Sequence, residues 1–232
     1  MKTLSRILLG VSVLLLSSFV QETQESKPYP KLKAYIEAIP KDFDKIPQER
    51  KDQLKKVTLF LKSKLSAEQK ASLVFICTHN SRRSHMAQIW AQTAADYYGI
   101  KGVSCFSGGT EATAFNPRAV KALTNAGFKI TPLSEDKNPV YEVKYADDAQ
   151  SIKAFSKKYS DDPNPKSNFC AVMTCSQADK TCPTVEGSTL RVAIPFEDPK
   201  AFDGTPEEEA KYDERCKQIA TEMFYIFSLY SK

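Results

Sequence analysis

The chain has 232 residues, of which 41% are hydrophobic and 26% charged, proportions typical of a soluble globular protein with one sizeable core. Its formal net charge is +5, but the basic residues form neither a block nor a stripe, which argues against a nucleic-acid partner. We therefore expect a protein that binds no nucleic acid. We also expect it to be a monomer.

The first residues resemble a targeting segment. Lys2 and Arg6 precede an apolar run over 7–20, and acidic residues begin only at Glu22. A basic start followed by a short apolar run is typical of a secretory signal peptide. The run is shorter than the ~20 residues of a comfortable membrane-spanning helix, although an uncleaved anchor is the alternative. We therefore expect an exported protein, either periplasmic or held at the membrane by residues 1–20.

A linker and a helical extension follow this segment. Residues 21–30 are polar and contain Pro28 and Pro30, which predicts a linker. Apolar residues then recur at three- and four-residue steps on both sides of Pro40 and Pro47. This spacing predicts two helices over 31–70, packed against a main domain over 71–232.

Strands and helices alternate through the main domain. We expect strands over 72–77, 103–107, 169–174 and 190–194, and helices over 84–98, 117–125 and 207–230. This alternation predicts an α/β fold with a four-stranded parallel sheet flanked by helices. Function is expected at the carboxyl ends of its strands. Within 131–168 the pattern is weak, and we expect a helix over 147–159 between loops.

The first predicted strand ends at a cysteine. Cys77 and Arg83 form a Cys-x5-Arg pattern at a strand-to-helix junction, and the loop between them contains Thr78, His79, Asn80, Ser81 and Arg82. Backbone N–H groups of such a loop converge on an anion, and their positive field favours a nucleophilic thiolate. Arg83 supplies a planar fork for two oxygens of phosphate or arsenate. The alternative is a buried cysteine near an unrelated surface arginine.

An acid is expected at the same edge of the sheet. Asp198 lies in the turn that follows the fourth predicted strand. A carboxylic acid there could protonate an oxygen leaving the adduct formed at Cys77.

The other five cysteines fall into two groups. Cys105, Cys170 and Cys216 lie on predicted buried faces and are expected to be small hydrophobic side chains. Cys175 ends the third predicted strand, and Cys182 follows a polar stretch. A helical turn or two would separate their sulfurs, and melting it would let them meet.

Three alternatives remain open for Cys175 and Cys182. They could form a structural disulfide, they could bind a metal together with His79 or His85, or they could form a redox relay in which Cys175 attacks Cys77 and Cys182 attacks Cys175. The spacing does not favour a metal, and we expect no metal and no other cofactor.

From about Ser72 to Tyr230 the chain resembles the low-molecular-weight protein tyrosine phosphatase superfamily and, within it, the thioredoxin-coupled arsenate reductases. This resemblance implies the same four-stranded sheet flanked by helices. It assigns the nucleophile to Cys77, the oxyanion-binding fork to Arg83 and the general acid to Asp198. It also implies that Ser84 hydrogen-bonds the thiolate. Further matching positions are Asn80, which shapes the loop, Ser107-Gly108-Gly109 and Asn116-Pro117.

The resemblance to the reductases depends on Cys175, Cys182 and the following Pro183, because simple phosphatases of this fold do not need that pair. It implies arsenate as substrate, a Cys175/Cys182 redox relay and a thioredoxin-like reductant as partner. One alternative is a tyrosine phosphatase that hydrolyses phosphomonoesters through a Cys77 phosphocysteine. Another is a non-catalytic oxyanion-binding or redox-sensing module.

Some positions depart from the reductase pattern. Arg82 replaces a dispensable cysteine of many reductases, and Gln88 replaces a glutamate that helps some of them bind potassium. The segment 131–168 is longer than in compact members, and residues 1–70 lie outside the resemblance. Export would require a thioredoxin-like reductant in the same compartment.

Overall fold

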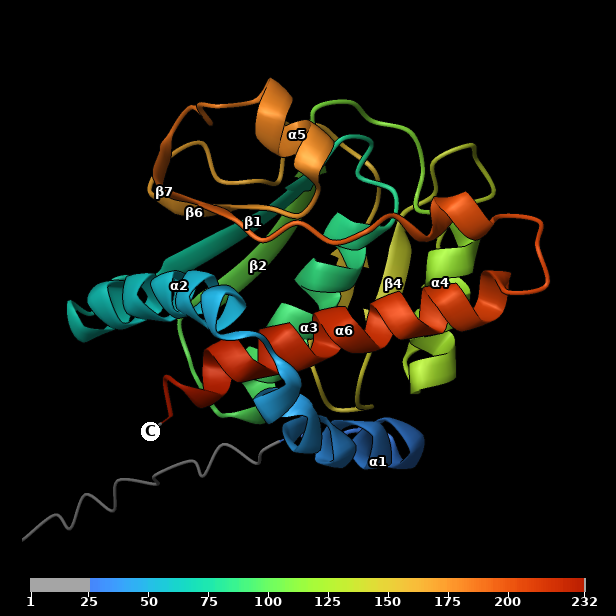
Figure 1. Ribbon diagram of the computed structural model, residues 1–232, viewed down its shortest axis with the longest axis horizontal. Helices are drawn as coiled ribbons and strands as arrows, with labels where there is room; N and C mark the ends of the chain where they lie inside the picture. Colours follow the sequence, from blue (N-terminus) through green and yellow to red (C-terminus); the bar gives the residue numbers. More distant parts are fainter. Residues whose placement is uncertain (1–25, 232) are drawn as a thin grey trace, which may run out of the picture.

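The computed structural model describes residues 26–231. Its main sheet has four parallel strands in the order β2-β1-β6-β7, as shown in Figure 1. The strands are β1 (Ala71–Cys77), β2 (Val103–Gly109), β6 (Phe169–Met173) and β7 (Ser188–Ala193). The predicted four-stranded parallel sheet is confirmed.

The central strand β1 is buried on both faces, as expected for a parallel strand covered on both sides. Leu73 and Phe75 point into the large core beneath the helices. Val74 and Ile76 point to the other face, into a smaller apolar cluster. This alternation fixes the position of β1 and so places its last residue, Cys77, at the edge of the sheet.

Three helices of the main domain pack together. They are α3 (Arg83–Tyr97), α4 (Pro117–Ala126) and α6 (Glu208–Ser228), and α6 lies against both α3 and α4 (Figure 1). Asn116 caps α4, since its side chain accepts a hydrogen bond from Arg118 N, and Pro117 occupies the first turn. The helix ends at Gly127, whose positive φ of 115° is typical of a helix C-terminus.

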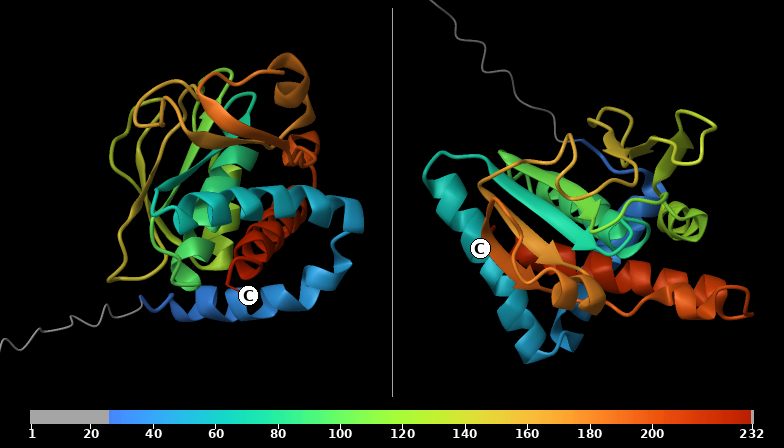
Figure 2. Two further views of the ribbon diagram at one scale, coloured as in Figure 1. Left: turned by 90° about the vertical axis from the view of Figure 1, so that its left-hand side faces the viewer. Right: turned by 90° about the horizontal axis from the view of Figure 1, so that it is seen from above.

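The predicted helical extension is present. It consists of α1 (Pro30–Ala38), the 3-10 helix η1 (Ile39–Lys45) and α2 (Gln48–Ser66). The extension turns at η1 and packs against α6, which is contacted by both η1 and α2 (Figure 2). Between residues 26 and 231, none of the helices combines the length and the apolar character needed to cross a membrane. The expected signal segment lies outside the described residues.

The segment 131–168 differs from the prediction. It contributes to a second sheet, which is antiparallel and consists of β3 (Lys129–Pro132), β4 (Tyr141–Lys144) and β5 (Ile152–Ala154). The prediction of a helix over 147–159 is wrong, because β5 lies within that range. Ile152 and Ala154 are buried while Lys153 between them is exposed, a two-residue period that suits a strand.

Candidate functional site

Cys77 lies at the carboxyl end of the central strand. Cys77 pairs with Gly109 at the end of β2, and the preceding residue, Ile76, pairs with Met173 on β6. The first residues after β1 form a loop that leads directly into α3 at Arg83. Open parallel sheets bind ligands beyond the carboxyl ends of their strands. The Cys77 side chain is 4% exposed at the floor of this loop.

The loop after Cys77 packs closely on the end of β2. Thr110 N donates to Cys77 O over 3.1 Å, and Glu111 N donates to Thr78 O over 2.8 Å. A Cβ atom at Gly109 would lie 2.7 Å from both Asn80 N and Thr78 O. Only glycine permits this approach, which explains the second glycine of the Ser-Gly-Gly sequence.

Asn80 and Ser84 connect the loop to the Cys77 sulfur. Ser84 Oγ lies 3.1 Å from Cys77 Sγ, and Asn80 Nδ2 donates to Ser84 Oγ over 2.9 Å. Asn80 is fully buried and has a positive φ of 43°, a conformation that asparagine tolerates better than most residues. Because Asn80 occupies one lone pair of Ser84, the serine hydroxyl is free to donate to the thiolate.

The structure brings Arg83 and Asp198 together. Arg83 Nη2 lies 2.7 Å from Asp198 Oδ2, and Arg83 Nη1 donates to Phe196 O over 2.9 Å. Asp198 follows β7 and caps η2 (Pro199–Phe202), with Oδ1 accepting from Lys200 N over 3.1 Å. The acid expected from the turn after the fourth strand therefore lies beside the arginine of the loop.

Two other loop side chains turn away from Cys77. Arg82 donates through Nε to Tyr212 OH over 2.9 Å and lies 3.7 Å from Asp203. His79 is half exposed and lies 3.5 Å from Glu111. The loop therefore presents its backbone, rather than these two side chains, to an anion at Cys77.

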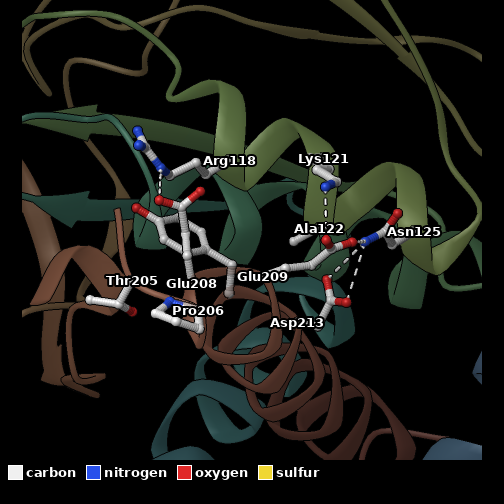
Figure 3. Close-up of a pocket in the computed structure, with 10 residues that line it drawn as sticks. Arg118, Lys121, Ala122, Asn125, Thr205, Pro206, Glu208, Glu209 and Asp213 are labelled. Atoms are coloured by element: carbon white, nitrogen blue, oxygen red, sulfur yellow. Dashed lines mark hydrogen bonds and ion pairs between the residues drawn. The ribbon is translucent and has the colours of Figure 1, made fainter. Parts of the chain in front are cut away.

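Behind Arg82 lies a separate surface pocket between α4 and α6, which also includes Tyr212. Figure 3 shows that oppositely charged side chains pair across it. Arg118 binds Glu208 and Lys121 binds Glu209, at 2.7 and 2.8 Å respectively. This pocket contains neither Cys77 nor any other cysteine, and its charges already have partners.

One apolar cluster involves three of the cysteines. Cys77 and Cys175 belong to the smaller apolar cluster, and Cys182 packs against it. Cys175 Sγ lies 3.5 Å from Thr78 Oγ1 in the loop, and the residue is fully buried. Cys175 and Cys182 cap the two ends of the short helix α5 (Ser176–Thr181), so a helix lies between the two cysteines.

The remaining cysteines are buried elsewhere, as predicted. Cys105, Cys170 and Cys216 are at most 7% exposed, and all six cysteines are free thiols. Burial raises the pKa of Cys105 well above its ordinary value and raises the pKa of Cys170 and Cys216 to about 12. These three thiols are therefore poor nucleophiles.

The segment 155–159 contacts the loop in a way that the sequence did not indicate. Lys157 N donates to Asn80 Oδ1 over 3.0 Å, and Ser156 Oγ donates to His79 O over 3.0 Å. Tyr159 packs beside Cys182, and burial together with that neighbouring thiol raises the pKa of its hydroxyl. No motif marks these residues, because their partners are distant in sequence.

His85 and Gln88, which were considered in connection with metal or potassium binding, lie in buried surroundings. His85 is fully buried, with Nδ1 3.2 Å from Ser107 Oγ, and burial lowers its pKa well below 6.5. Gln88 Nε2 donates to Cys105 O, while its Oε1 has no hydrogen-bond partner within 26–231. Over the same described range, no three His, Cys, Asp or Glu side chains are grouped to hold a metal ion.

Comparison with known proteins identifies the family of the chain. The model of the low molecular weight phosphotyrosine protein phosphatase family matches residues 72–147. An arsenate reductase of Brevibacillus brevis is 32% identical over 156 residues, covering 66% of this chain and 96% of the relative. The chain belongs to the low molecular weight phosphotyrosine protein phosphatase family. An arsenate reductase of Bacillus licheniformis is 30% identical over 161 residues, which cover 68% of this chain and 96% of the relative.

Two solved structures align with this chain at low sequence identity. A low molecular weight phosphotyrosine phosphatase from Vibrio cholerae O395 has a TM-score of 0.46 at 12% identity, covering 70% of this chain and 97% of that one. An arsenate reductase in the phosphate-binding state has a TM-score of 0.45 at 14% identity, covering 68% and 98% respectively.

Proposed function

We propose that the protein is an arsenate reductase that uses three thiols in sequence. The observation that carries the proposal is that Cys77 and Cys175 belong to one apolar cluster and Cys182 packs against it, with Cys175 Sγ 3.5 Å from Thr78 Oγ1 in the loop. A hydrolase of this fold needs one thiol, whereas a reductase needs the further two. The names of the curated relatives support the same assignment.

The first step takes place at the loop. Arsenate binds to the backbone N–H groups of 78–83 and to Arg83, and the Cys77 thiolate attacks arsenic. A sulfur–arsenic bond forms and an arsenic–oxygen bond breaks, and Asp198 protonates the departing oxygen. Preorganised donors that stabilise such an oxyanion contribute several kcal/mol. Arg83 exchanges Asp198, now 2.7 Å away, for the incoming oxyanion.

Two thiol exchanges complete the reaction. Cys175 attacks Cys77 Sγ, the sulfur–arsenic bond breaks, and its electron pair leaves with arsenic as arsenite. Cys182 then attacks Cys175, forming a Cys175–Cys182 disulfide and releasing the Cys77 thiolate. A thioredoxin-like dithiol reduces that disulfide and returns the enzyme to its starting state.

A paired assay on the mature protein tests the proposal. Arsenate-dependent oxidation of a thioredoxin-like dithiol is compared with hydrolysis of an aryl phosphate, for wild type, Cys175→Ser and the matched control Cys105→Ala. We expect Cys175→Ser to lose arsenate turnover and to keep phosphate hydrolysis, with the control keeping both. Repeated reductive turnover by Cys175→Ser would refute the relay.

Phosphomonoester hydrolysis is the second candidate. The family model matches residues 72–147, which contain Cys77 and Arg83 but neither Cys175 nor Cys182. The loop and Asp198 suffice for a phosphocysteine mechanism. Phosphatase activity with no arsenate turnover in wild type would reverse the order of the two candidates, and a loop that binds phosphate without either reaction would indicate a binding or sensing module.

The proposal includes export and a monomeric state. Residues 1–20 would carry the protein out of the cytoplasm, where its reductant would be an extracytoplasmic dithiol. Cell fractionation with and without residues 1–20 tests the first point, and light scattering of the mature protein tests the second. A cytoplasmic location of the full chain would point to the ordinary cellular dithiol pool.

A further inference from the structure

The two thiols of the proposed relay are held apart by α5. Cys175 Sγ accepts a hydrogen bond from Ala178 N over 3.3 Å at one end, and Cys182 N donates to Ala178 O over 3.0 Å at the other. The seven residue steps from Cys175 to Cys182, at 1.5 Å per step along a helix, give an axial separation of roughly 10 Å. The Cα atoms of a disulfide lie within about 7 Å. The helix must therefore unwind before Cys175 and Cys182 can bond.

One side chain from the neighbouring strand holds the end of α5 that must move. Arg191 on β7 donates through Nη2 to Asp179 O and Oδ1 over 2.8 and 2.6 Å, and through Nε to Cys182 O over 3.2 Å. Carbonyls in the last turn of a helix have no partner within the helix. The guanidinium supplies that partner to two of them and also pairs with a carboxylate, which Lys could not do with the same geometry.

These contacts are a large share of what α5 has. A helix of six residues is not stable on its own, because the cost of nucleation exceeds the gain from so few hydrogen bonds. Its stability must come from the packing of Ala178 into the apolar cluster and from the bonds to Arg191. The backbone of Arg191 is held in the sheet by the pairing of β7 with β6 and does not belong to α5.

We propose that Arg191 is a positioning residue that keeps Cys182 away from Cys175 until the Cys77–Cys175 disulfide has formed. This inference rests on the proposed relay. In the step concerned, the Cys182 thiolate attacks Cys175 Sγ, the Cys175–Cys182 bond forms, and Cys77 leaves as a thiolate with no net oxidation. Unwinding of α5 breaks the three hydrogen bonds from Arg191 and brings Cys182 within reach.

The proposal predicts a shift in the dithiol–disulfide equilibrium. The bonds of Arg191 exist in the dithiol form with α5 wound and are lost in the disulfide form. Replacing Arg191 therefore destabilises the dithiol form and favours the Cys175–Cys182 disulfide. We expect about a tenfold change in the equilibrium constant, which for two electrons lowers the reduction potential by about 30 mV.

The test uses the full mature chain with Cys77→Ser, which isolates the last pair of thiols from the first. The fraction of Cys175–Cys182 disulfide is measured by alkylation and mass spectrometry in dithiothreitol buffers of graded oxidation. Arg191→Gln should show the tenfold shift, Arg191→Lys a smaller one, and Asp179→Asn a smaller one that leaves both carbonyl contacts in place. The matched control is Lys153→Gln, which removes a 2.8 Å pair with Glu142 far from α5.

The outcomes separate this inference from the proposed function. An unchanged equilibrium constant in both Arg191→Gln and Asp179→Asn overturns the role of Arg191 and leaves the relay intact. An equal shift in Lys153→Gln overturns it as well, because the effect would then be general. Failure of the parent protein to form any Cys175–Cys182 disulfide overturns the relay and, with it, the role of Arg191.

Discussion

Arg50 links the helical extension to the segment that leads to Asp198, and replacing it should strongly lower the free energy of unfolding. Arg50 on α2 donates to Glu222 of α6 over 2.8 Å and to Pro195 O over 2.9 Å. Its guanidinium also lies 4.8 Å from the centre of the Phe196 ring. Arg50 and Glu222 are 17% and 4% exposed, so Arg50→Met would leave a buried carboxylate without its counter-charge.

Breaking a buried pair from one side typically costs 3–5 kcal/mol, and we expect a loss of about 4 kcal/mol in the free energy of unfolding. Burial already raises the pKa of Glu222 despite the opposing effect of Arg50. An acid with a raised pKa stabilises the fold below its unfolded pKa and loses that contribution as pH rises. The loss in Arg50→Met should therefore be larger at pH 8 than at pH 5, where protonation relieves the buried charge.

Urea denaturation at the two pH values measures this effect. The double variant Arg50→Met with Glu222→Leu should recover much of the loss, since it removes the unpaired charge. The matched control in the same extension is Lys33→Met, whose pair with Glu37 is exposed on both sides and should contribute less than about 1 kcal/mol. A loss below 1 kcal/mol in Arg50→Met, independent of pH, would refute the reasoning.

Three further predictions concern the loop and its surroundings. Burial lowers the pKa of Lys157 to about 8 from 10.5, so the free energy of unfolding should rise between pH 8 and 10.5. Lys157→Met should flatten that rise and add at most about 3 kcal/mol at pH 7, measured by guanidinium denaturation. Asn80→Ala should lower the free energy of unfolding, measured in urea, by about 2–4 kcal/mol and should slow turnover. Two buried hydrogen bonds are lost, and alanine tolerates the positive φ less well than asparagine. Asn80→Gly should relieve only the backbone strain. Burial lowers the pKa of His85. The free energy of unfolding should therefore fall below about pH 6.5, by up to about 1.4 kcal/mol for each pH unit. This slope should be absent in His85→Gln and kept in the control His79→Gln.

Local patterns predicted the elements that carry the chemistry. The apolar run before Cys77 and the helical spacing after Ser84 are consecutive in sequence, so their junction could be read directly. The same holds for Cys175 and Cys182, because a capped turn of six residues depends on neighbours. The acid at Asp198 required one further step, since the carboxyl ends of parallel strands meet at a common edge.

Contacts between distant segments could not be predicted in this way. Arg82 was expected to belong to the anion loop, yet its side chain is drawn to Tyr212, 130 residues away. Lys157 supports the site through one hydrogen bond to Asn80, and Arg191 through three to Asp179 and Cys182; no sequence spacing connects these partners. The helix expected over 147–159 failed for a related reason, because pairing with β4 stabilises the strand and overrides a weak local preference.

The position of α5 links the proposed chemistry to a change of structure. Cys175 is at once the attacking thiol and the residue whose sulfur caps the helix, so the bond it forms with Cys77 would draw this acceptor away from Ala178 N. A buried N–H without a partner costs about 1–3 kcal/mol, which is a large amount for a helix of six residues. The second step of the relay would therefore weaken α5 at its first residue, and the third step would need that weakening in order to bring Cys182 across. In such a scheme each exchange prepares the next, and Arg191 sets how far the helix stays wound before the first exchange occurs.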